Sequence, residues 1–433
     1  MAFSSSLSRR AVLAHGQPIG TLMSRALAQP ELISLAAGFV DQVTLPLAAV
    51  DDAWRSLAAD TAAGHAALQY GTTAGYRPLR EALLEEQRTA DGNPAAERSL
   101  TPEQVIVTSG SNQLLHLLAD TLFDPGDIVL CAAPTYFVYL GVMKNLQVRA
   151  ISVACDDYGL MPDALEDCLG RIAGRGELDR VKAIYVVSYF DNPRSVTLSA
   201  DRRAELVAIA KRWSQRRRIY VLEDAAYRKL RYDGDDVPSL RAFDEEGDTV
   251  IVTQTFSKSF SPGVRVGWGI VPEELMGPLC DQKSNIDFGA PNLNQHLMYR
   301  VIESGVCERQ VVLLREAYRR KRDAMLAACE EHLTDIEGVH WLKPAGGLYV
   351  WLTVASDIDA GFQGTLFDTA LAAGVIYVPG EYSYASEGEP IARNTMRLSY
   401  GVQSPERIRE GIRLLAGAIR QVRMTGTDSP YQR

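Results

Sequence analysis

The sequence predicts an α/β fold in which a large domain contains a seven-stranded, mostly parallel sheet and a smaller α/β domain follows it. Three observations lead to this prediction. Short β-branched runs alternate with amphipathic helical stretches from about residue 105 to residue 271, the pattern of a parallel sheet covered by helices on both faces. The sequence changes after Pro291 to a long charged helix. With 433 residues, 46% of them hydrophobic, the chain is long enough for more than one domain.

The strands of the large sheet are expected at seven apolar runs. These runs cover residues 105–108, 128–132, 148–153, 183–188, 219–224, 250–255 and 266–271. Leucines recur at helical spacing over residues 114–122, and Pro125-Gly126 and Asp233-Gly234 mark turns.

The smaller unit is expected to begin with a helix over residues 308–332 and to end with an amphipathic helix over residues 405–422. Strands are expected between these helices, near residues 340–354, 375–378 and 395–400. We therefore divide the chain into an N-terminal arm (1–45), a large domain (46–305) and a small C-terminal domain (306–433).

Composition narrows the classes of function. A net charge of −9 and a pI near 5.4 argue against binding to nucleic acid or to a membrane surface, and no apolar run is long enough to cross a bilayer. Six scattered cysteines without a CxxC pair fit reduced thiols in the cytoplasm. Cys329 and His332 lack further ligands at metal-binding spacing, so no metal site is predicted.

One N-terminal feature bears on location. Ser8-Arg9-Arg10, with the small residues Ala26-Leu27-Ala28 further on, loosely resembles a twin-arginine export signal. Polar residues, glycines and a proline over residues 15–20 interrupt the apolar stretch that such a signal needs. We therefore interpret this segment as an arm of a cytoplasmic protein.

Lys258 is the most informative residue of the sequence. It follows an apolar strand closely and stands near Thr255, Ser257 and Arg265. Burial at a strand end lowers the pKa of a lysine and favours the neutral amine that forms imines, while the hydroxyls and the guanidinium offer donors and positive charge to a phosphate. Taken alone, the segment also fits a surface loop rich in Ser, Lys and Arg.

Asp224 ends another apolar strand, at the edge where α/β sheets open their binding crevice. A carboxylate placed there keeps a pyridine nitrogen protonated, which makes the ring an electron sink. Tyr227 and Asn192 follow strands and could donate hydrogen bonds to the ring phenolate. In isolation, helix capping explains Asp224 and an ordinary turn explains Asn192.

The segment from Thr108 to Gln113 joins a strand to a leucine-rich helix. Its Gly110, Ser111 and Asn112 bring backbone N–H groups and a helix N-terminus to the turn, an arrangement that suits an anion. Serine and glycine also begin many helices for capping alone, so this motif is weak by itself.

Taken together, the motifs resemble a known family. In order, they are Tyr70 with Gly75 and Leu79-Arg80, Gly110-Ser111-Asn112, Pro134-Thr135-Tyr136, Asn192-Pro193, Asp224 with Tyr227, Ser257-Lys258 with Pro262-Gly263 and Arg265, Gly346-Gly347, and Arg397-Leu398-Ser399-Tyr400. This series resembles the class I/II aminotransferases of fold type I, which have the aspartate aminotransferase fold and use pyridoxal 5'-phosphate (PLP). It is most similar to the branch of 2-aminoadipate and kynurenine aminotransferases, and it covers residues 33 to 418.

The resemblance implies a role for each matching residue. Lys258, Asp224 and Tyr227 would be catalytic: Lys258 would bind the PLP aldehyde as an imine and then move protons, Asp224 would pair with the pyridine nitrogen, and Tyr227 would bond the phenolate together with Asn192. Tyr136 would stack on the ring. The phosphate would be held by Gly110, Ser111, Asn112, Thr255, Ser257 and Arg265, and by Tyr70 of a neighbouring subunit in a homodimer with shared sites. Arg397 would bind the substrate carboxylate, with Gly38 and Asn192 close by.

The resemblance implies an aminotransferase of amino acid metabolism, which transfers the amino group of an amino acid to a 2-oxo acid. Phe39, Tyr189, Phe190 and Tyr349 favour a neutral or aromatic amino acid. Acidic-substrate relatives carry an arginine about where Gly20 stands here, which further disfavours a dicarboxylate.

Two alternatives remain open at this point. Where the family carries Asn-Pro-Thr-Gly, this chain has Asn192-Pro193-Arg194-Ser195, which motivates a PLP-dependent oxidase, lyase, decarboxylase or cyclase of secondary metabolism. Ser195 in place of glycine predicts a different turn. Arg194 is expected to point into solvent rather than to select an acidic substrate at the mouth of the site, with Asp191 available as its partner.

The other alternative is a PLP-sensing regulator. Such proteins carry a DNA-binding domain before the aminotransferase-like domain. The match begins near residue 33 and the pI is acidic, so we do not expect a regulator.

Overall fold

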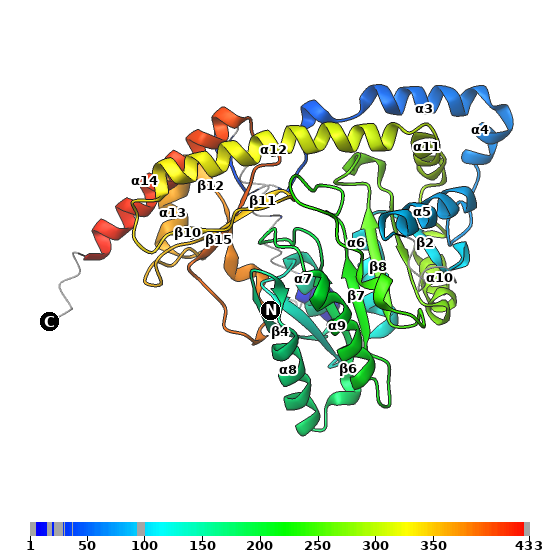
Figure 1. Ribbon diagram of the computed structural model, residues 1–433, viewed down its shortest axis with the longest axis horizontal. Coiled ribbons are helices and arrows are strands. Elements are labelled where there is room, and N and C mark those ends of the chain that lie inside the picture. Colours follow the sequence, from blue (N-terminus) through cyan, green and yellow to red (C-terminus); the bar gives the residue numbers. More distant parts are fainter. Residues whose placement is uncertain are drawn as a thin grey trace.

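The computed structural model describes residues 6–14, 20, 29, 31–36, 38–92 and 100–427 (Figure 1). The helices are α1 (Arg9–Ala14), α3 (Leu47–Ala59), α4 (Thr61–Ala67), α5 (Arg77–Ala90), α6 (Ser111–Leu122), α7 (Phe137–Leu146), α8 (Pro162–Gly174), α9 (Ala200–Trp213), α10 (Glu273–Asp287), α11 (Asn292–Glu303), α12 (Val306–Leu333), α13 (Thr365–Ala372) and α14 (Pro405–Thr427). The strands are β1 (Ile33–Ser34), β2 (Val105–Thr108), β3 (Ile128–Ala133), β4 (Arg149–Asp156), β5 (Gly159–Leu160), β6 (Val181–Val187), β7 (Tyr220–Asp224), β8 (Val250–Thr255), β9 (Gly267–Ile270), β10 (His340–Trp341), β11 (Tyr349–Thr353), β12 (Val375–Ile376), β13 (Val378–Pro379), β14 (Glu387–Gly388) and β15 (Thr395–Ser399).

The large sheet contains the seven predicted strands. Its order is β14-β4-β3-β6-β7-β8-β9-β2, with β5 beside β4. The strands from β4 to β8 run parallel, while β9 is antiparallel to both of its neighbours. The prediction of a mostly parallel sheet is therefore confirmed. The prediction missed β5 and β14, because a strand of only two residues is too short to show a periodic pattern.

Helices cover both faces of this sheet. Every residue of β2, β3, β7, β8 and β9 is buried. Since successive side chains of a strand point to opposite faces, neither face of these strands is open to water. The helices α6 and α7 pack together over the sheet, as do α8 and α9.

All strands of the large sheet except β5 and β9 bring their carboxyl ends to one edge of the sheet. β2, β3, β6, β7 and β8 share one direction and end at Thr108, Ala133, Val187, Asp224 and Thr255. In open α/β sheets, ligands bind in the crevice outside this edge. The loops that follow these five strands carry most of the predicted site residues.

The C-terminal part forms a second, antiparallel sheet. Its order is β10-β11-β15-β13, and α12, α13 and α14 accompany it. The helices predicted over residues 308–332 and 405–422 are α12 and α14. The strand region predicted near residues 340–354 is divided into β10 and β11, since Pro344 and the positive φ of Gly347 interrupt it. In Figure 1, α12 runs along the top of the molecule to α14.

Segments far apart in the sequence interlock. β1, near the N-terminus, pairs in parallel with β12, and β14 joins the edge of the large sheet beside β4. The backbone N–H of Ser399 donates to the carbonyl of Leu35 at 2.7 Å. These contacts carry the segment that ends at Gly38 to the C-terminal unit, beside Arg397.

The N-terminal segment contributes one short helix to the described residues. α1 contains Arg9 and Arg10 and packs on α7, whereas the export-like residues 26–28 lie outside the described part of the chain. None of the helices described above combines the length and apolar character that a bilayer crossing requires.

Candidate active site

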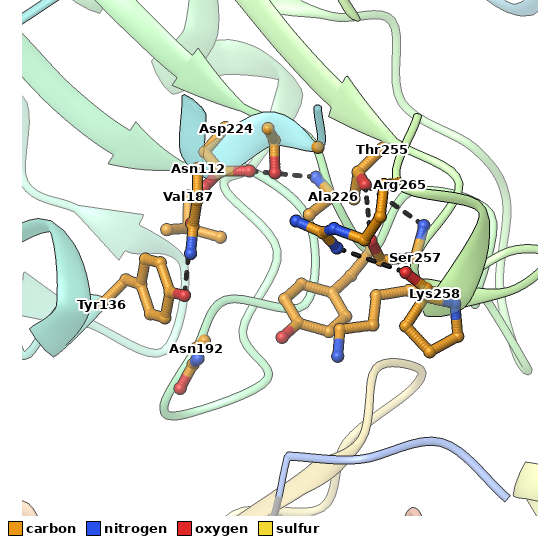
Figure 2. Close-up of a pocket in the computed structure, with 14 residues that line it drawn as sticks. Asn112, Tyr136, Val187, Asn192, Asp224, Ala226, Thr255, Ser257, Lys258 and Arg265 are labelled. Carbon is orange, nitrogen blue, oxygen red and sulfur yellow. Dashed lines mark hydrogen bonds between the residues drawn. The ribbon is translucent and has the colours of Figure 1, made fainter. Parts of the chain in front are cut away.

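A cavity of about 200 Å³ opens at the carboxyl edge of the large sheet (Figure 2). Its lining residues come from the carboxyl ends of β6, β7 and β8 and from the segments that follow β2, β3, β6, β7 and β8. They are Gly110, Ser111, Asn112, Tyr136, Val187, Asn192, Asp224, Ala226, Tyr227, Thr255, Ser257, Lys258, Pro262 and Arg265. The structure thus brings eleven of the predicted site residues together around one space.

Lys258 lies three residues beyond the end of β8. Its Nζ donates a hydrogen bond to the carbonyl of Gly38 at 2.8 Å. Burial lowers the pKa of the Lys258 ammonium below its usual value, and the charges of Arg397 and Arg265 act in the same direction. This shift increases the share of the neutral amine, which is the nucleophilic form.

Asp224 is a buried carboxylate at the end of β7. Its Oδ2 accepts a hydrogen bond from Tyr185 at 3.0 Å, and its Oδ1 accepts one from the backbone N–H of Ala226 at 3.2 Å. Burial raises the pKa of Asp224 from 3.8 to about 6, although both hydrogen bonds oppose the rise. In the described part of the chain, no Lys or Arg side chain forms an ion pair with this carboxylate. It is thus suited to a cationic partner within the cavity.

The groups that were predicted to bind an anion lie around Gly110. Gly110 has a φ of +87° and precedes α6, so the N-terminus of this helix opens on the cavity. A Cβ at Gly110 would stand only 2.7 Å from an Nη2 atom of Arg265. Glycine therefore allows the guanidinium to lie close to the turn. Ser257 adds a hydroxyl, which accepts a hydrogen bond from Thr255 at 2.9 Å.

Figure 2 shows Tyr136 and Asn192 on one side of the cavity and Thr255, Ser257 and Arg265 on the other. The Tyr136 hydroxyl donates to Oδ1 of Asn112 at 3.4 Å. Burial raises the pKa of Tyr136 to about 12, so its hydroxyl stays protonated at neutral pH.

Arg397 and Gly38 do not line the cavity, but each bonds a residue that does: Arg397 bonds Asn192 and Gly38 bonds Lys258. Nη1 of Arg397 donates to Oδ1 of Asn192 at 2.8 Å, and Nη2 donates to the carbonyl of Ala36 at 2.9 Å. The Arg397 side chain is buried, and its Nε has no hydrogen-bond partner among the described residues. A buried guanidinium with an unused donor, next to the lysine, is suited to binding a carboxylate.

Tyr70 is apart from the other predicted residues within this chain. It is 86% exposed, packs its ring against Phe288 at 6.3 Å between centroids, and does not line the cavity.

Two predictions about the Asn192-Pro193-Arg194-Ser195 segment are wrong. Arg194 does not point into solvent: it is buried, Nη1 donates to the carbonyl of Asp156 at 3.0 Å, and Nε lies 3.4 Å from the Asp191 carboxylate. Ser195 does not form a different turn, since it keeps a positive φ of +58°. Hydrogen bonds hold this turn, because Asp191 accepts from the backbone N–H groups of both Ser195 and Val196. The partnership of Arg194 with Asp191 is confirmed.

Sequence reasoning missed several residues of the site. Val187, Ala226 and Pro262 line the cavity, and Tyr185 bonds Asp224. The position of Val187 at the end of a strand could have identified it, whereas nothing local distinguishes Tyr185 from other buried strand residues.

Phe39, Tyr189, Phe190 and Tyr349 were expected near the site, and none of them lines this cavity. Tyr189 lies under the guanidinium groups of Arg203 and Arg228 instead. Tyr349 reaches the lining residue Tyr227, with 3.0 Å between the two hydroxyl oxygens.

Comparison with known proteins identifies the family. Residues 30–415 match the family described as aminotransferase class I and II. The chain is 36% identical over 391 residues to aromatic-amino-acid aminotransferase 1 of Thermococcus litoralis, covering 90% of this chain and 88% of that protein. It is 31% identical over 394 residues to 2-aminoadipate transaminase of Thermus thermophilus, covering 90% and 91%.

Solved structures agree with this family and its fold. The kynurenine aminotransferase of Pyrococcus horikoshii, in complex with PMP, superposes with a TM-score of 0.87 at 33% identity, covering 96% of this chain and 97% of that one. An aspartate aminotransferase of Thermus thermophilus, 24% identical, shares the fold with a TM-score of 0.78 over 96% of this chain and 100% of that one. The predicted aspartate aminotransferase-like fold is thus confirmed. The chain belongs to the class I and II aminotransferase family and is a PLP-dependent amino acid aminotransferase.

Proposed function

We propose that Lys258, Asp224 and Tyr227 are the catalytic residues of an aminotransferase that takes its amino group from neutral or aromatic amino acids. One observation carries the assignment of the site. A half-buried lysine whose pKa is lowered and a buried carboxylate without an ion-pair partner among the described residues lie on the same cavity, beside a helix N-terminus and an arginine.

The donor set fits PLP. Gly110, Ser111, Asn112, Thr255, Ser257 and Arg265 would hold the phosphate through hydroxyls, backbone N–H groups and a guanidinium. Asp224 would meet the pyridine nitrogen, whose positive charge supplies the partner that the buried carboxylate lacks. Tyr136 would cover one face of the ring.

Tyr227 and Asn192 would donate to the phenolate oxygen of the ring. Because Asn192 already uses Oδ1 to accept from Arg397, its NH2 group is left to donate. Bound PLP supplies an electron sink for the carbanion that forms when the Cα–H bond of the substrate breaks.

The chain itself would orient the substrate and move its proton. Arg397 would hold the substrate carboxylate with two parallel hydrogen bonds, in place of its present bond to the Ala36 carbonyl. Nζ of Lys258 would take the proton from the substrate Cα. It would then deliver this proton to the carbon atom on the other side of the amino nitrogen. Burial lowers the pKa of Lys258, which increases the share of the neutral amine that can accept this proton.

The proposed preference for neutral or aromatic substrates is supported by the charges near the site. Arg194 is buried against the Asp191 carboxylate and the Asp156 carbonyl and does not line the cavity, so its charge lies away from a substrate bound there. Aromatic rings of Phe137 and Tyr349 flank Arg397. Relatives named for aromatic amino acids and for kynurenine support the same class.

Two measurements test the assignment. Lys258→Ala should reduce turnover by at least about 1000-fold, with the circular dichroism spectrum unchanged; activity close to that of the wild type would refute the role of Lys258. The values of kcat/KM for phenylalanine and leucine should exceed those for aspartate, glutamate and 2-aminoadipate. A preference for the dicarboxylic donors would refute the proposed substrate class but not the site.

We also propose that the enzyme is a homodimer whose subunits share their active sites, with Tyr70 reaching the phosphate of its partner. Exposed apolar side chains support an interface around Tyr70. Leu68, Tyr70, Ile286 and Phe288 are each more than half exposed, and Tyr70 packs against Phe288. A water-exposed group of this kind is typical of an interaction surface.

Subunit hybrids test the sharing. Lys258→Ala and Tyr70→Ala homodimers should both be weak, whereas mixing and refolding them should restore activity. Each hybrid then holds one site with both Lys258 and the partner's Tyr70 intact. Hybrids that stay as weak as their parents, or a protein that sediments as a monomer, would contradict the proposal.

The division into an arm (1–45), a PLP-binding domain (46–305) and a small domain (306–433) remains our proposal, as does a cytoplasmic location. The two sheets support the division after about residue 305. Six cysteines that remain free thiols are typical of a reducing compartment. Cell fractionation would test the location directly.

A further inference from the structure

Tyr349 is a buried tyrosine that the reaction described above does not use. It begins β11 and pairs in register with Ser399 of β15, so its side chain reaches the site from the C-terminal unit. The aromatic ring faces Arg397, while the hydroxyl faces Tyr227. The ring and the hydroxyl therefore serve different partners.

The ring supports the substrate-binding arginine. The guanidinium carbon of Arg397 lies 4.2 Å from the centre of the Tyr349 ring and 5.5 Å from that of Phe137. A cation over an aromatic face is attracted by the ring electrons. Phenylalanine at position 349 would keep this contact, which allows the hydroxyl to be tested separately.

The hydroxyl forms a pair with Tyr227. The two oxygens are 3.0 Å apart, and the rings meet edge to face at 74°. A Cβ on Gly38 would lie 3.1 Å from the Tyr349 oxygen, so the glycine leaves room for this hydroxyl. Each hydroxyl has a single proton to donate. If Tyr227 donates its proton to the cofactor, Tyr349 must be the donor within the pair.

The surrounding charges favour the same direction. Burial alone would raise the pKa of Tyr349, but the charges of Arg397 and Lys258, together with the hydrogen bond to Tyr227, place this pKa below its usual value. Burial holds the pKa of Tyr227 well above its usual value, and Tyr136 is a further titratable group facing it. The Arg397 guanidinium lies against the Tyr349 ring, and its positive charge makes the Tyr349 hydroxyl a better donor toward Tyr227.

We propose that Tyr349 is a positioning residue that donates to Tyr227 and thereby fixes Tyr227 as a donor to the phenolate oxygen of the cofactor. Hydrogen bonds in a chain polarise one another, so Tyr227 becomes a stronger donor than it would be alone. The inference rests on the proposed function, because it requires Tyr227 to face bound PLP.

The test follows the visible absorption band of the holoenzyme as a function of pH. A stronger donor at the phenolate stabilises its negative charge and lowers the pH at which the chromophore binds a proton. Tyr349→Phe should therefore raise the midpoint by about half a pH unit, and Tyr227→Phe should raise it further. In the Tyr227→Phe background, Tyr349→Phe should add nothing. The KM for the amino acid should stay within about twofold in Tyr349→Phe, since the ring still supports Arg397.

Several outcomes would overturn the proposal. A midpoint that Tyr349→Phe does not move, or a shift of equal size in both backgrounds, would show that Tyr349 does not act through Tyr227. If Tyr227→Phe itself produces no shift, the proposed role of Tyr227 fails as well, and the two failures are thereby distinguished. As a control, Tyr377→Phe removes a buried hydroxyl that donates to the Ala360 carbonyl at 3.1 Å, and it should leave the midpoint unchanged.

A second variant covers the case in which Tyr349→Phe does not fold. Replacing Tyr349 by 3-fluorotyrosine keeps the shape and the hydroxyl but makes that hydroxyl more acidic. The midpoint should then move to lower pH, opposite to the effect of phenylalanine. An unchanged or raised midpoint with 3-fluorotyrosine would overturn the proposal by itself.

Discussion

Replacing Asp224 by asparagine should make the protein without cofactor more stable while it damages the loaded enzyme. Burial raises the pKa of Asp224 from 3.8 to about 6. A rise of this size corresponds to about 3 kcal/mol of stability lost once the carboxyl is ionised. Asparagine has the same shape and no charge. It can accept from the Ala226 N–H and donate to the Tyr185 oxygen, so both contacts stay hydrogen-bonded, the second with its direction reversed.

The effect has a definite pH dependence. The folded-state pKa of Asp224 lies above the unfolded-state value, so the folded protein binds the proton more tightly. The cost of the carboxylate is absent below about pH 4, grows as the pH rises toward 6, and is constant above about pH 7. Asp224→Asn should thus gain about 3 kcal/mol over the wild type at pH 8 and about half as much at pH 5.

Urea denaturation of the two proteins after removal of PLP measures this difference. All other titrating groups are shared, so their contributions cancel in the comparison. Asp235→Asn, which neutralises an exposed carboxylate, should change stability by less than about 0.5 kcal/mol at either pH. In the loaded enzyme, Asp224→Asn should reduce kcat by at least about 100-fold, because the ring nitrogen loses its counter-charge. A stability difference that is the same at pH 5 and pH 8 would refute the reasoning.

Three further predictions concern other parts of the site. Arg397→Lys keeps the charge but loses the two-pronged geometry, so steady-state assays should show KM for the amino acid rising about 10- to 100-fold; an unchanged KM would exclude Arg397 from carboxylate binding. Gly110→Ala places a methyl group 2.7 Å from Arg265 at a φ of +87°, so fluorescence titration should show PLP binding weakened by at least about tenfold. Wild-type affinity would mean that Gly110 does not shape the proposed phosphate site. Arg194→Ala leaves Asp191 buried without its partner, so the free energy of unfolding in urea should fall by about 3 to 5 kcal/mol, while the preference for neutral over acidic donors stays the same. A changed preference would show that Arg194 takes part in selecting the substrate.

Local patterns were enough to predict the cofactor end of the site. Thr108, Asp224 and Thr255 each end a predicted strand that the structure contains. Because parallel strands bring their carboxyl ends to one edge, residues that follow different strands could be expected to meet there. The family resemblance placed Lys258 and Asp224 on the same cofactor, and both line one cavity.

The turn after Asn192 shows where local rules failed. The preference of glycine for positive φ predicted a changed turn at Ser195, and the length of Arg194 predicted exposure. Both predictions overlooked Asp191, whose backbone and side-chain oxygens hold the turn and pair with the arginine. Context supplied hydrogen bonds that outweigh the intrinsic cost of a positive φ.

The sequence by itself determined the fold class, the strands after which reactive side chains stand, and the pairing of Lys258 with Asp224. Strand periodicity, strand ends and the family motifs can all be recognised from short runs of neighbouring residues. Only the tertiary structure decided the substrate end. The contacts of Gly38 with Lys258, Arg397 with Asn192, and Tyr349 with Tyr227 join residues 220, 205 and 122 positions apart. They depend on the pairing of β1 with β12 and on the second sheet. Contacts over such separations leave no periodicity in the sequence, since they arise only when complete elements pack.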